Sequence, residues 1–395
     1  MRYMRKFIAI VVLAYVIAHT FYFIYSITHV SYSRREFSKR DLTDFPIPVQ
    51  DLSDGPLVMK EGKVVVNGKI IGSVKRPRPK ATKYAKNSKK EKLPEIKAKP
   101  SKETPKEQIK PLELDADFVK EFVEEAVKMH AENKLIYLTV VNGAFERLTL
   151  NWLCNVAEFE GIHQRLLIVS TSKILCDSVH EEYGEALKCI FLRLPGFEED
   201  LDWGERKYIN FLAVRAKMMK ILAEHSIRFV LIEADSTWFR DPTDLFRNAT
   251  LVDDADVVVP IKGDTHKGDI FAFSPMLVEP TNSSVVLLEE MNKRLQGNDS
   301  LYDQDVLNEL CSVQFRGIVC RNFEYNEIAD GKWFYMDDET KSSMKPYVVN
   351  NNFYVGIKNK EARQAINGLW FLTKSGHCSA AKVKRARERL LGESN

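Results

Sequence analysis

Short apolar runs alternate with helical patterns from about residue 115 onward, and this alternation constrains the fold more than any other feature. Branched and aromatic residues predict buried strands at 135–141, 166–169, 189–192, 229–232 and 256–259. Between them, apolar residues at helical spacing predict helices around 118–127, 148–156 and 207–223. Because strands that alternate with helices are joined by right-handed crossovers, we predict an α/β fold whose Rossmann-like, mainly parallel sheet is flanked by helices.

Two carboxylates follow the predicted strand at 229–232. Glu233 and Asp235 come directly after it, and Pro242 stops any regular element a few residues later. The C-terminal ends of buried parallel strands are where open α/β sheets bind ligands. Oxygen donors at that edge suit Mg²⁺ or Mn²⁺, which keep positions open for the oxygens of a substrate diphosphate. Acidic residues also form turns without any ligand, so the pattern alone leaves a purely structural role open.

An apolar run at 7–27 predicts a helix that spans a membrane. Basic residues precede it at 2–6, and about twenty apolar residues suffice to cross a bilayer. A cleaved signal peptide is the alternative, but the run is long for one and no small-residue cleavage site closes it. We therefore predict a cytoplasmic tail at 1–6 and an uncleaved signal-anchor at 7–27, which would give the protein its membrane association.

The segment 28–114 has the composition of a stem. Between 75 and 111 it is rich in Lys, Pro, Glu, Ser and Thr and almost lacks aromatic residues, so it cannot bury a core. A basic tract can also bind nucleic acid, but without interleaved aromatic residues a solvated spacer is favoured and we expect no nucleic-acid partner. Within the stem, Asn67 and Gly68 predict a hairpin at 63–72. One domain at 115–395 would follow.

Cysteines and glycosylation sequons favour a luminal position for that domain. All six cysteines follow the stem, an even count that is compatible with disulfides. The sequence does not determine their pairing, and the most local candidates are Cys176 with Cys189 and Cys311 with Cys320. Three N-glycosylation acceptors occur, at Asn248, Asn282 and Asn298. Together with the anchor, they predict a single-pass type II glycoprotein of the Golgi or ER membrane.

Several common catalytic motifs do not occur in this sequence. It contains no GxGxxG loop and no GxxxxGK[ST] loop, so the dinucleotide and P-loop interpretations lose support. It also contains no GxSxG elbow and no HExxH run of a hydrolase.

Four segments in order resemble the nucleotide-diphospho-sugar transferase family. The first is Lys-Met-Met-Lys-Ile-Leu from Lys217, followed by the strand and the sequence Glu-Ala-Asp-Ser-Thr-Trp from Glu233, which resembles the family's D-x-D-x-x-W. The second is Tyr-Asp-Gln-Asp-Val-Leu-Asn at 302–308, and the third is the Asn-rich segment 347–358, which ends near Gly356. Trp370 comes last. The resemblance covers about residues 134–371 and implies a GT-A fold and glycosyltransferase activity with a nucleotide-diphosphate donor, expected to be a UDP-sugar.

The resemblance also implies roles for individual residues. Asp235 and Glu233 would hold Mn²⁺ or Mg²⁺, with Asn350 at the position of a third ligand. The acceptor side and any catalytic base would come from the start of a helix, at Asp303, Gln304 and Asp305. The residues expected to bind the nucleotide-sugar are Asn142, Gly143, Lys217, Glu233, Asp235, Trp238, Asn351 and Gly356. Lys217 as a solvated lysine and Asp303 as a helix cap are the structural alternatives.

Two departures from the family pattern bear on the metal. The first acid of D-x-D is Glu233, whose side chain is longer by one methylene, and the family's histidine is replaced by Asn350. An amide oxygen is a weaker ligand than imidazole for Mn²⁺. The favoured function is transfer of a hexose or pentose to a glycan or glycoprotein, with the family leaning toward a retaining course. The alternative is an inactive luminal protein of the same fold that acts as a scaffold or glycan-binding partner.

Overall fold

A computed structural model describes residues 57–60, 63–66, 69–73, 112–263, 271–298 and 300–392. The chain divides into two compact units, 1–76 and 77–395. In the first unit, strands β1 (Leu57–Lys60), β2 (Lys63–Val66) and β3 (Lys69–Ser73) form an antiparallel sheet. Strands β2 and β3 pair where the hairpin at 63–72 is predicted. The predicted tail, the predicted span and most of the predicted stem lie outside the described residues.

None of the helices in the described ranges is long and apolar enough to cross a membrane.

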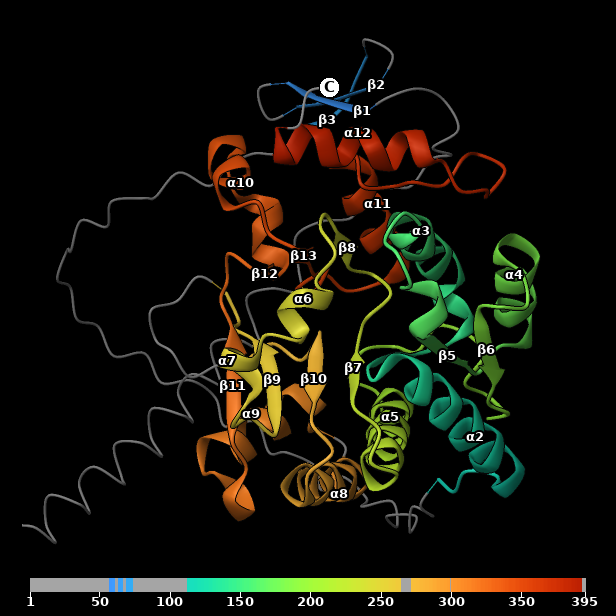
Figure 1. The fold of residues 1–395 in the computed structure, drawn as a ribbon. Helices are drawn as coiled ribbons and strands as arrows, with labels where there is room; N and C mark the ends of the chain where they lie inside the picture. The colour runs from blue at the N-terminus through green and yellow to red at the C-terminus, as the bar shows by residue number, and fades with distance from the viewer. Residues whose placement is uncertain are drawn as a thin grey trace, which may run out of the picture. The chain divides into compact units, whose positions relative to one another are not determined.

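The second unit is built on a seven-stranded sheet, shown in Figure 1, with the order β11-β9-β10-β7-β4-β5-β6. Four neighbouring strands are parallel: β7 (Phe229–Leu231), β4 (Ile136–Val141), β5 (Leu166–Ser170) and β6 (Lys188–Phe191). Strand β10 (Met276–Val278) runs antiparallel between β7 and β9 (Val257–Pro260), and β11 (Cys320–Phe323) is parallel to β9. The prediction of a mainly parallel sheet is confirmed, although neither β10 nor β11 was predicted.

Helices cover both faces of this sheet because alternate strand residues point to opposite sides. Ile136 and Leu138 join the apolar cluster beneath α2 (Ala116–Asn133), α5 (Arg206–Glu224), α8 (Asn282–Gly297) and α9 (Asp303–Ser312). Tyr137 belongs to the opposite cluster, with α3 (Glu146–Val156), α4 (Lys173–Tyr183) and α6 (Thr243–Phe246). Helices α5 and α8 pack against each other. The remaining short helical segments between β4 and β11 are η1 (Gly143–Phe145), η2 (His163–Arg165), α7 (Ala249–Val252) and η3 (Phe315–Gly317).

A second, smaller sheet is formed by three two-residue strands. Strand β13 (Val348–Val349) lies between β12 (Ile328–Ala329), to which it is parallel, and β8 (Thr237–Trp238), to which it is antiparallel. This sheet connects the chain that leaves β7 to the C-terminal part of the unit. That part contains η4 (Gly331–Tyr335), α10 (Asp338–Met344), α11 (Ile357–Ile366) and α12 (Ala380–Leu391).

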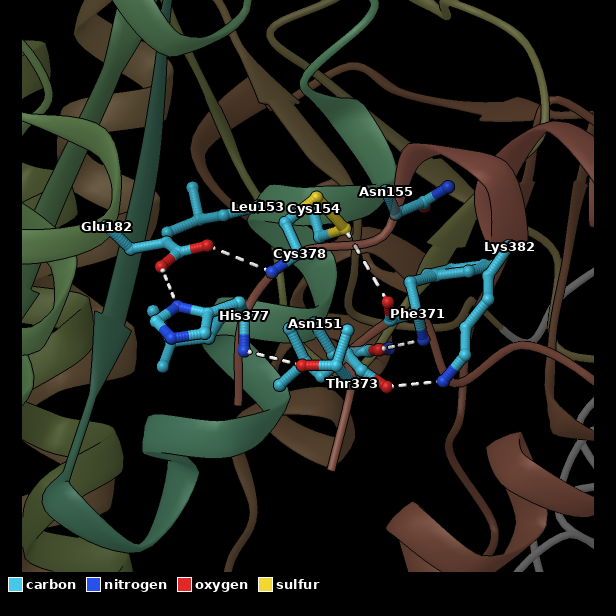
Figure 2. Close-up of a disulfide and its surroundings, with 12 residues drawn as sticks. Asn151, Leu153, Cys154, Asn155, Glu182, Phe371, Thr373, His377, Cys378 and Lys382 are labelled. Carbon is cyan, nitrogen blue, oxygen red and sulfur yellow. Dashed lines mark hydrogen bonds and ion pairs between the residues drawn. A yellow bond between two sulfur atoms is a disulfide. The ribbon is translucent and has the colours of Figure 1, made fainter. Parts of the chain in front are cut away.

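Disulfides fix three parts of the unit. The pairs Cys176–Cys189 and Cys311–Cys320 confirm the two local candidates, and Cys154–Cys378 joins α3 to the segment before α12. Figure 2 shows how Glu182 supports the last bridge: its carboxylate accepts from the backbone N–H of Cys378 and pairs with His377. The hydrogen bond and charge of Glu182 raise the pKa of His377. The C-terminal segment is therefore held on α3 and α4.

All three predicted glycosylation acceptors, Asn248, Asn282 and Asn298, are exposed. Asn282 is the first residue of α8, where Thr281 and Ser284 form a capping box.

Candidate active site

The site lies where the main sheet meets the small one. After β7, the N–H of Ile232 still bonds to the carbonyl of Leu138 on β4, and the chain then turns. The N–H and the hydroxyl of Ser236 both donate to the carbonyl of Glu233, which closes this turn. Glu233 and Asp235 therefore stand at the C-terminal edge of the parallel strands, where open α/β sheets bind ligands.

A buried arginine that the sequence analysis missed organises the cluster. Arg215, on α5, has a side chain only 9% exposed and pairs with Glu233 at 3.1 Å and with Asp303 on α9. Its guanidinium also lies 4.7 Å from the ring centroid of Phe273. Burial opposes the charge of Arg215, but Asp303 and Glu233 together outweigh it, so the pKa of the guanidinium is raised. One cation thus ties the end of β7 to two helices.

Glu233 is the carboxylate of this cluster that faces outward. Its side chain keeps 31% exposure, against 8% for Asp303. Burial raises its pKa, Arg215 opposes that rise, and the neighbouring Asp235 adds to it. A further cation placed beside Glu233 would therefore stabilise the ionised form of this carboxylate.

Asp235 is almost fully buried and is held by α11. The Lys360 ammonium pairs with its carboxylate, and the amide of Gln364 donates to its backbone carbonyl at 2.7 Å. Lys360 and Gln364 are four residues apart, so they lie on one face of the helix. That face of α11 is therefore docked on the turn that carries both acids.

Asn350 and Asn351 follow β13 and lie beside the same turn. The amide of Asn350 donates to the carbonyl of Ser274, while its buried Oδ1 has no hydrogen-bond partner in the described part of the chain. The Asn351 Oδ1 accepts from Arg363 Nε at 2.6 Å. Gly356, with φ of +90°, begins α11 in a conformation that favours glycine. Asn351 and Gly356 thus position α11, and their predicted role in donor binding stays a prediction.

The oxygens at this corner suit a hard divalent cation. Glu233 and Asp235 offer carboxylates, and the unpartnered Asn350 Oδ1 offers an amide oxygen. In the described ranges, no group of three or more His, Cys, Asp or Glu side chains could hold a metal. Asn350 would therefore be needed to complete the predicted set.

Asn142 and Gly143 directly follow β4, where the strand order reverses. The Asn142 amide donates to the carbonyl of Glu199 at 2.7 Å, and the Gly143 N–H donates to that of Glu198 at 2.7 Å. A Cβ at position 143 would lie 2.4 Å from the latter oxygen, so only glycine permits this approach. Both residues thus stand at a switch point next to β7, and their predicted role in nucleotide binding stays a prediction.

Helix α9 brings one of its three predicted residues into the cluster. Asp303 begins the helix, pairs with Arg215 and also accepts from the backbone N–H of Gln304. Gln304 is half-buried and Asp305 is exposed. Because Asp305 is two residues farther along, it lies about 200° around the helix from Asp303.

Lys217 and Trp238 lie apart from this cluster. Lys217 is two residues beyond Arg215 on α5 and therefore points to a different side of the helix. Trp238 is fully buried, packs edge-on against Tyr137 and Trp152, and donates through its indole to Ser236. In this conformation Trp238 supports the turn from within the core and exposes no surface to a nucleotide.

The sequence model described as nucleotide-diphospho-sugar transferase matches residues 161–364, just over half of the chain. The chain belongs to the nucleotide-diphospho-sugar transferase family. The matched segment contains Arg215, Glu233, Asp235, Asp303 and Lys360, so the cluster described above lies within the family domain.

Solved structures similar to this chain are glycosyltransferases, and no curated protein matches it significantly in sequence. The galactosyltransferase LgtC, in complex with donor and acceptor sugar analogues, is 14% identical, with a TM-score of 0.40 over 66% of this chain and 98% of that one. The glycosyltransferase GlyE of Streptococcus pneumoniae is 12% identical, with a TM-score of 0.38 over 64% and 63%. Mouse xyloside xylosyltransferase 1 is 12% identical, with a TM-score of 0.36 over 55% and 98%.

Replacing the buried arginine should destabilise this transferase domain in a pH-dependent way. Arg215→Met leaves Asp303 and Glu233 without their cation, and we expect a loss of about 3 kcal/mol in the free energy of unfolding at pH 8. A carboxyl group whose pKa is higher in the folded protein than in the unfolded chain costs stability when ionised. The pKa of Glu233 is already raised and should rise further, so the loss should shrink as the pH falls toward 4.5, the ordinary pKa of glutamate.

Urea denaturation from pH 8 to pH 5 measures this loss. Arg193→Met, at an exposed arginine, removes the same charge and serves as the control. An equal loss at every pH, or no loss, would contradict the assigned role of Arg215.

Proposed function

We propose that this protein is an active glycosyltransferase that moves a sugar from a UDP-sugar to a hydroxyl group of a glycan or glycoprotein. The observation that carries this proposal is the turn at Glu233–Asp235, where acids and cations converge at the switch point of the sheet in a member of this family. Diphosphate and divalent cation carry opposite charges, and a site that mixes carboxylates with ammonium and guanidinium groups can hold both.

The diphosphate would lie between the turn and α11. Lys360 offers an ammonium on this helix, and the helix begins at Ile357 with its first backbone N–H groups outside the hydrogen-bond ladder. Such N–H groups favour phosphate oxygens. Asn142 and Gly143, at the adjacent strand end, support a place for the nucleotide.

Glu233, Asp235 and the Asn350 Oδ1 would hold Mn²⁺ or Mg²⁺. When bound, such an ion supplies a Lewis acid that neutralises charge on the departing nucleotide diphosphate. Arg215 favours the ionised form of Glu233 and orients its side chain, and Gln364 fixes the backbone at Asp235.

The state of Asp303 supports a retaining course. Its buried carboxylate is occupied by Arg215 and by the N–H of Gln304. An inverting reaction requires a free carboxylate base on the acceptor hydroxyl, whereas a retaining reaction does not. We therefore assign to Asp303 the role of positioning Arg215. Gln304, which is half-buried, is the residue proposed to contact the transferred hexose or pentose.

The acceptor side is proposed at Trp203. Trp203 is 55% exposed, and its ring stacks on Tyr302 with ring centroids 4.8 Å apart and the planes 5° from parallel. Tyr302 immediately precedes Asp303 on α9. Sugar rings present C–H faces that pack on aromatic rings, and binding sites combine such apolar surfaces with a few polar groups. This exposed ring beside the acidic cluster suits an acceptor sugar.

Three disulfides and three exposed sequons support a luminal, oxidising environment for this domain. With the apolar run at 7–27, they support a single-pass type II protein of the Golgi or ER membrane.

An inactive scaffold of the same fold is the second candidate. The replacement of the family's histidine by Asn350 favours it, because an amide oxygen binds Mn²⁺ less strongly than imidazole does. Hydrolysis or transfer from any nucleotide-sugar in a donor panel separates the two.

Asp235→Asn tests the active-enzyme proposal. It keeps the size of the side chain but removes its charge, so we expect transfer to fall by at least about 100-fold. In the same variant, UDP should no longer raise the melting temperature in the presence of Mn²⁺. Asp177→Asn, at an exposed aspartate of α4, is the control and should behave like the wild type. Full activity in Asp235→Asn would refute the metal assignment, and wild-type protein inert to every donor would favour the scaffold.

Trp203→Ala tests the acceptor side. With a panel of methyl glycosides as acceptors, we expect the acceptor KM to rise roughly 10-fold, which corresponds to about 1.4 kcal/mol. The affinity for UDP should not change, because Trp203 is not among the groups assigned to the donor. Phe191→Ala, at another partly exposed aromatic residue, is the matched control. An unchanged acceptor KM would place the acceptor elsewhere.

A further inference from the structure

The ammonium of Lys360 occupies a position made of metal-type ligands. It donates to a carboxylate oxygen of Asp235 and, at 3.0 Å, to the backbone carbonyl of Asn351. The side chains of Asp235 and Lys360 are only 5% and 17% exposed, so the pair is inside the site. Carboxylate and carbonyl oxygens are also the ligands that Mg²⁺ and Mn²⁺ select.

We propose that Lys360 holds the place of the divalent cation until a nucleoside diphosphate arrives, so that metal and diphosphate bind together rather than separately. This inference rests on the proposed function and concerns how the same site is filled. It follows from competition: an ammonium and a divalent cation cannot both contact one carboxylate oxygen, because they repel each other strongly at such distances.

The charges of the cluster explain why the diphosphate releases Lys360. Three carboxylates, on Glu233, Asp235 and Asp303, face the two cations Arg215 and Lys360. A divalent cation alone would have to displace Lys360 and leave its charge unpaired beside the metal. A diphosphate that arrives with the metal offers that ammonium new oxygen acceptors. Lysine suits such an exchange because its charge sits on a flexible four-carbon stem with three rotatable donors.

Other contacts hold α11, so Lys360 is not needed as its anchor. Gln364 bonds to the backbone of Asp235, and Arg363 donates to the side chain of Asn351 at 2.6 Å and to the carbonyl of Asn352 at 2.7 Å. A variant at Lys360 should therefore keep the helix docked while it frees the oxygens of Asp235 and Asn351.

Mn²⁺ titrations of the full chain, followed by the electron paramagnetic resonance of free Mn²⁺, test the inference with and without saturating UDP. Wild-type protein should bind Mn²⁺ weakly alone and more tightly with UDP. Lys360→Met should tighten binding of Mn²⁺ alone by on the order of 10-fold, because no ammonium then competes for Asp235. UDP should then enhance Mn²⁺ binding less, and Mn²⁺ should enhance UDP binding less by the same factor, because affinity coupling between two ligands is reciprocal. Lys360→Gln, which keeps a polar side chain, should act in the same direction.

Lys293→Met is the control, because it removes an exposed lysine of α8, a helix that has no assigned role in binding the metal or the diphosphate. It should leave both Mn²⁺ affinities unchanged. If Lys360→Met and Lys360→Gln bind Mn²⁺ alone no better than the wild type, although UDP still promotes Mn²⁺ binding, this inference is overturned and the proposed function stands. If the wild type binds neither Mn²⁺ nor UDP, the proposed function falls, and this inference falls with it.

Discussion

The buried guanidinium of Arg215 is the interaction on which the rest of the site depends. It joins α5, the turn after β7 and the start of α9 through two carboxylates. Without it, the buried carboxylate of Asp303 would lose its cation and would repel the nearby carboxylate of Glu233, so its charge would be costly. Arginine suits this position because its planar fork can serve two partners at once.

A second cation, Lys360, does for Asp235 what Arg215 does for Glu233. The two pairs give a turn whose acids are balanced by the protein's own charges. The two ion pairs differ in how freely the cation can move. Arg215 is fixed between two carboxylates and beneath Phe273, while Lys360 reaches the site on a flexible stem from a helix that is anchored by other residues. We therefore expect a divalent cation to replace Lys360 at Asp235, and Arg215 to keep its place.

Much of this could be predicted from the sequence, because β7, β4 and β5 are buried on both faces and their sequences are apolar runs. The antiparallel β10 was not predicted because Ser274 and Pro275 interrupt its apolar run and leave only three residues, whereas the run at 229–232 has four. The two-residue strands of the small sheet exist only through tertiary pairing. Arg215 was not predicted because a single arginine among the apolar residues of a helix belongs to no motif, and the helical pattern does not show which acids it meets. Lys360 was not predicted because it lies two residues beyond the motif segment 347–358, although it is within the range of about 134–371 that resembles the family.

The central claim is that the turn at Asp235 binds a metal together with a nucleoside diphosphate. Crystals grown with Mn²⁺ and UDP would test it through the anomalous scattering of manganese. The account predicts one strong peak at about 2.1 Å from a carboxylate oxygen of Asp235, with Asn350 Oδ1 as a further ligand and the UDP phosphates alongside. UDP bound with no manganese at Asp235, or with Lys360 still paired to Asp235, would contradict it.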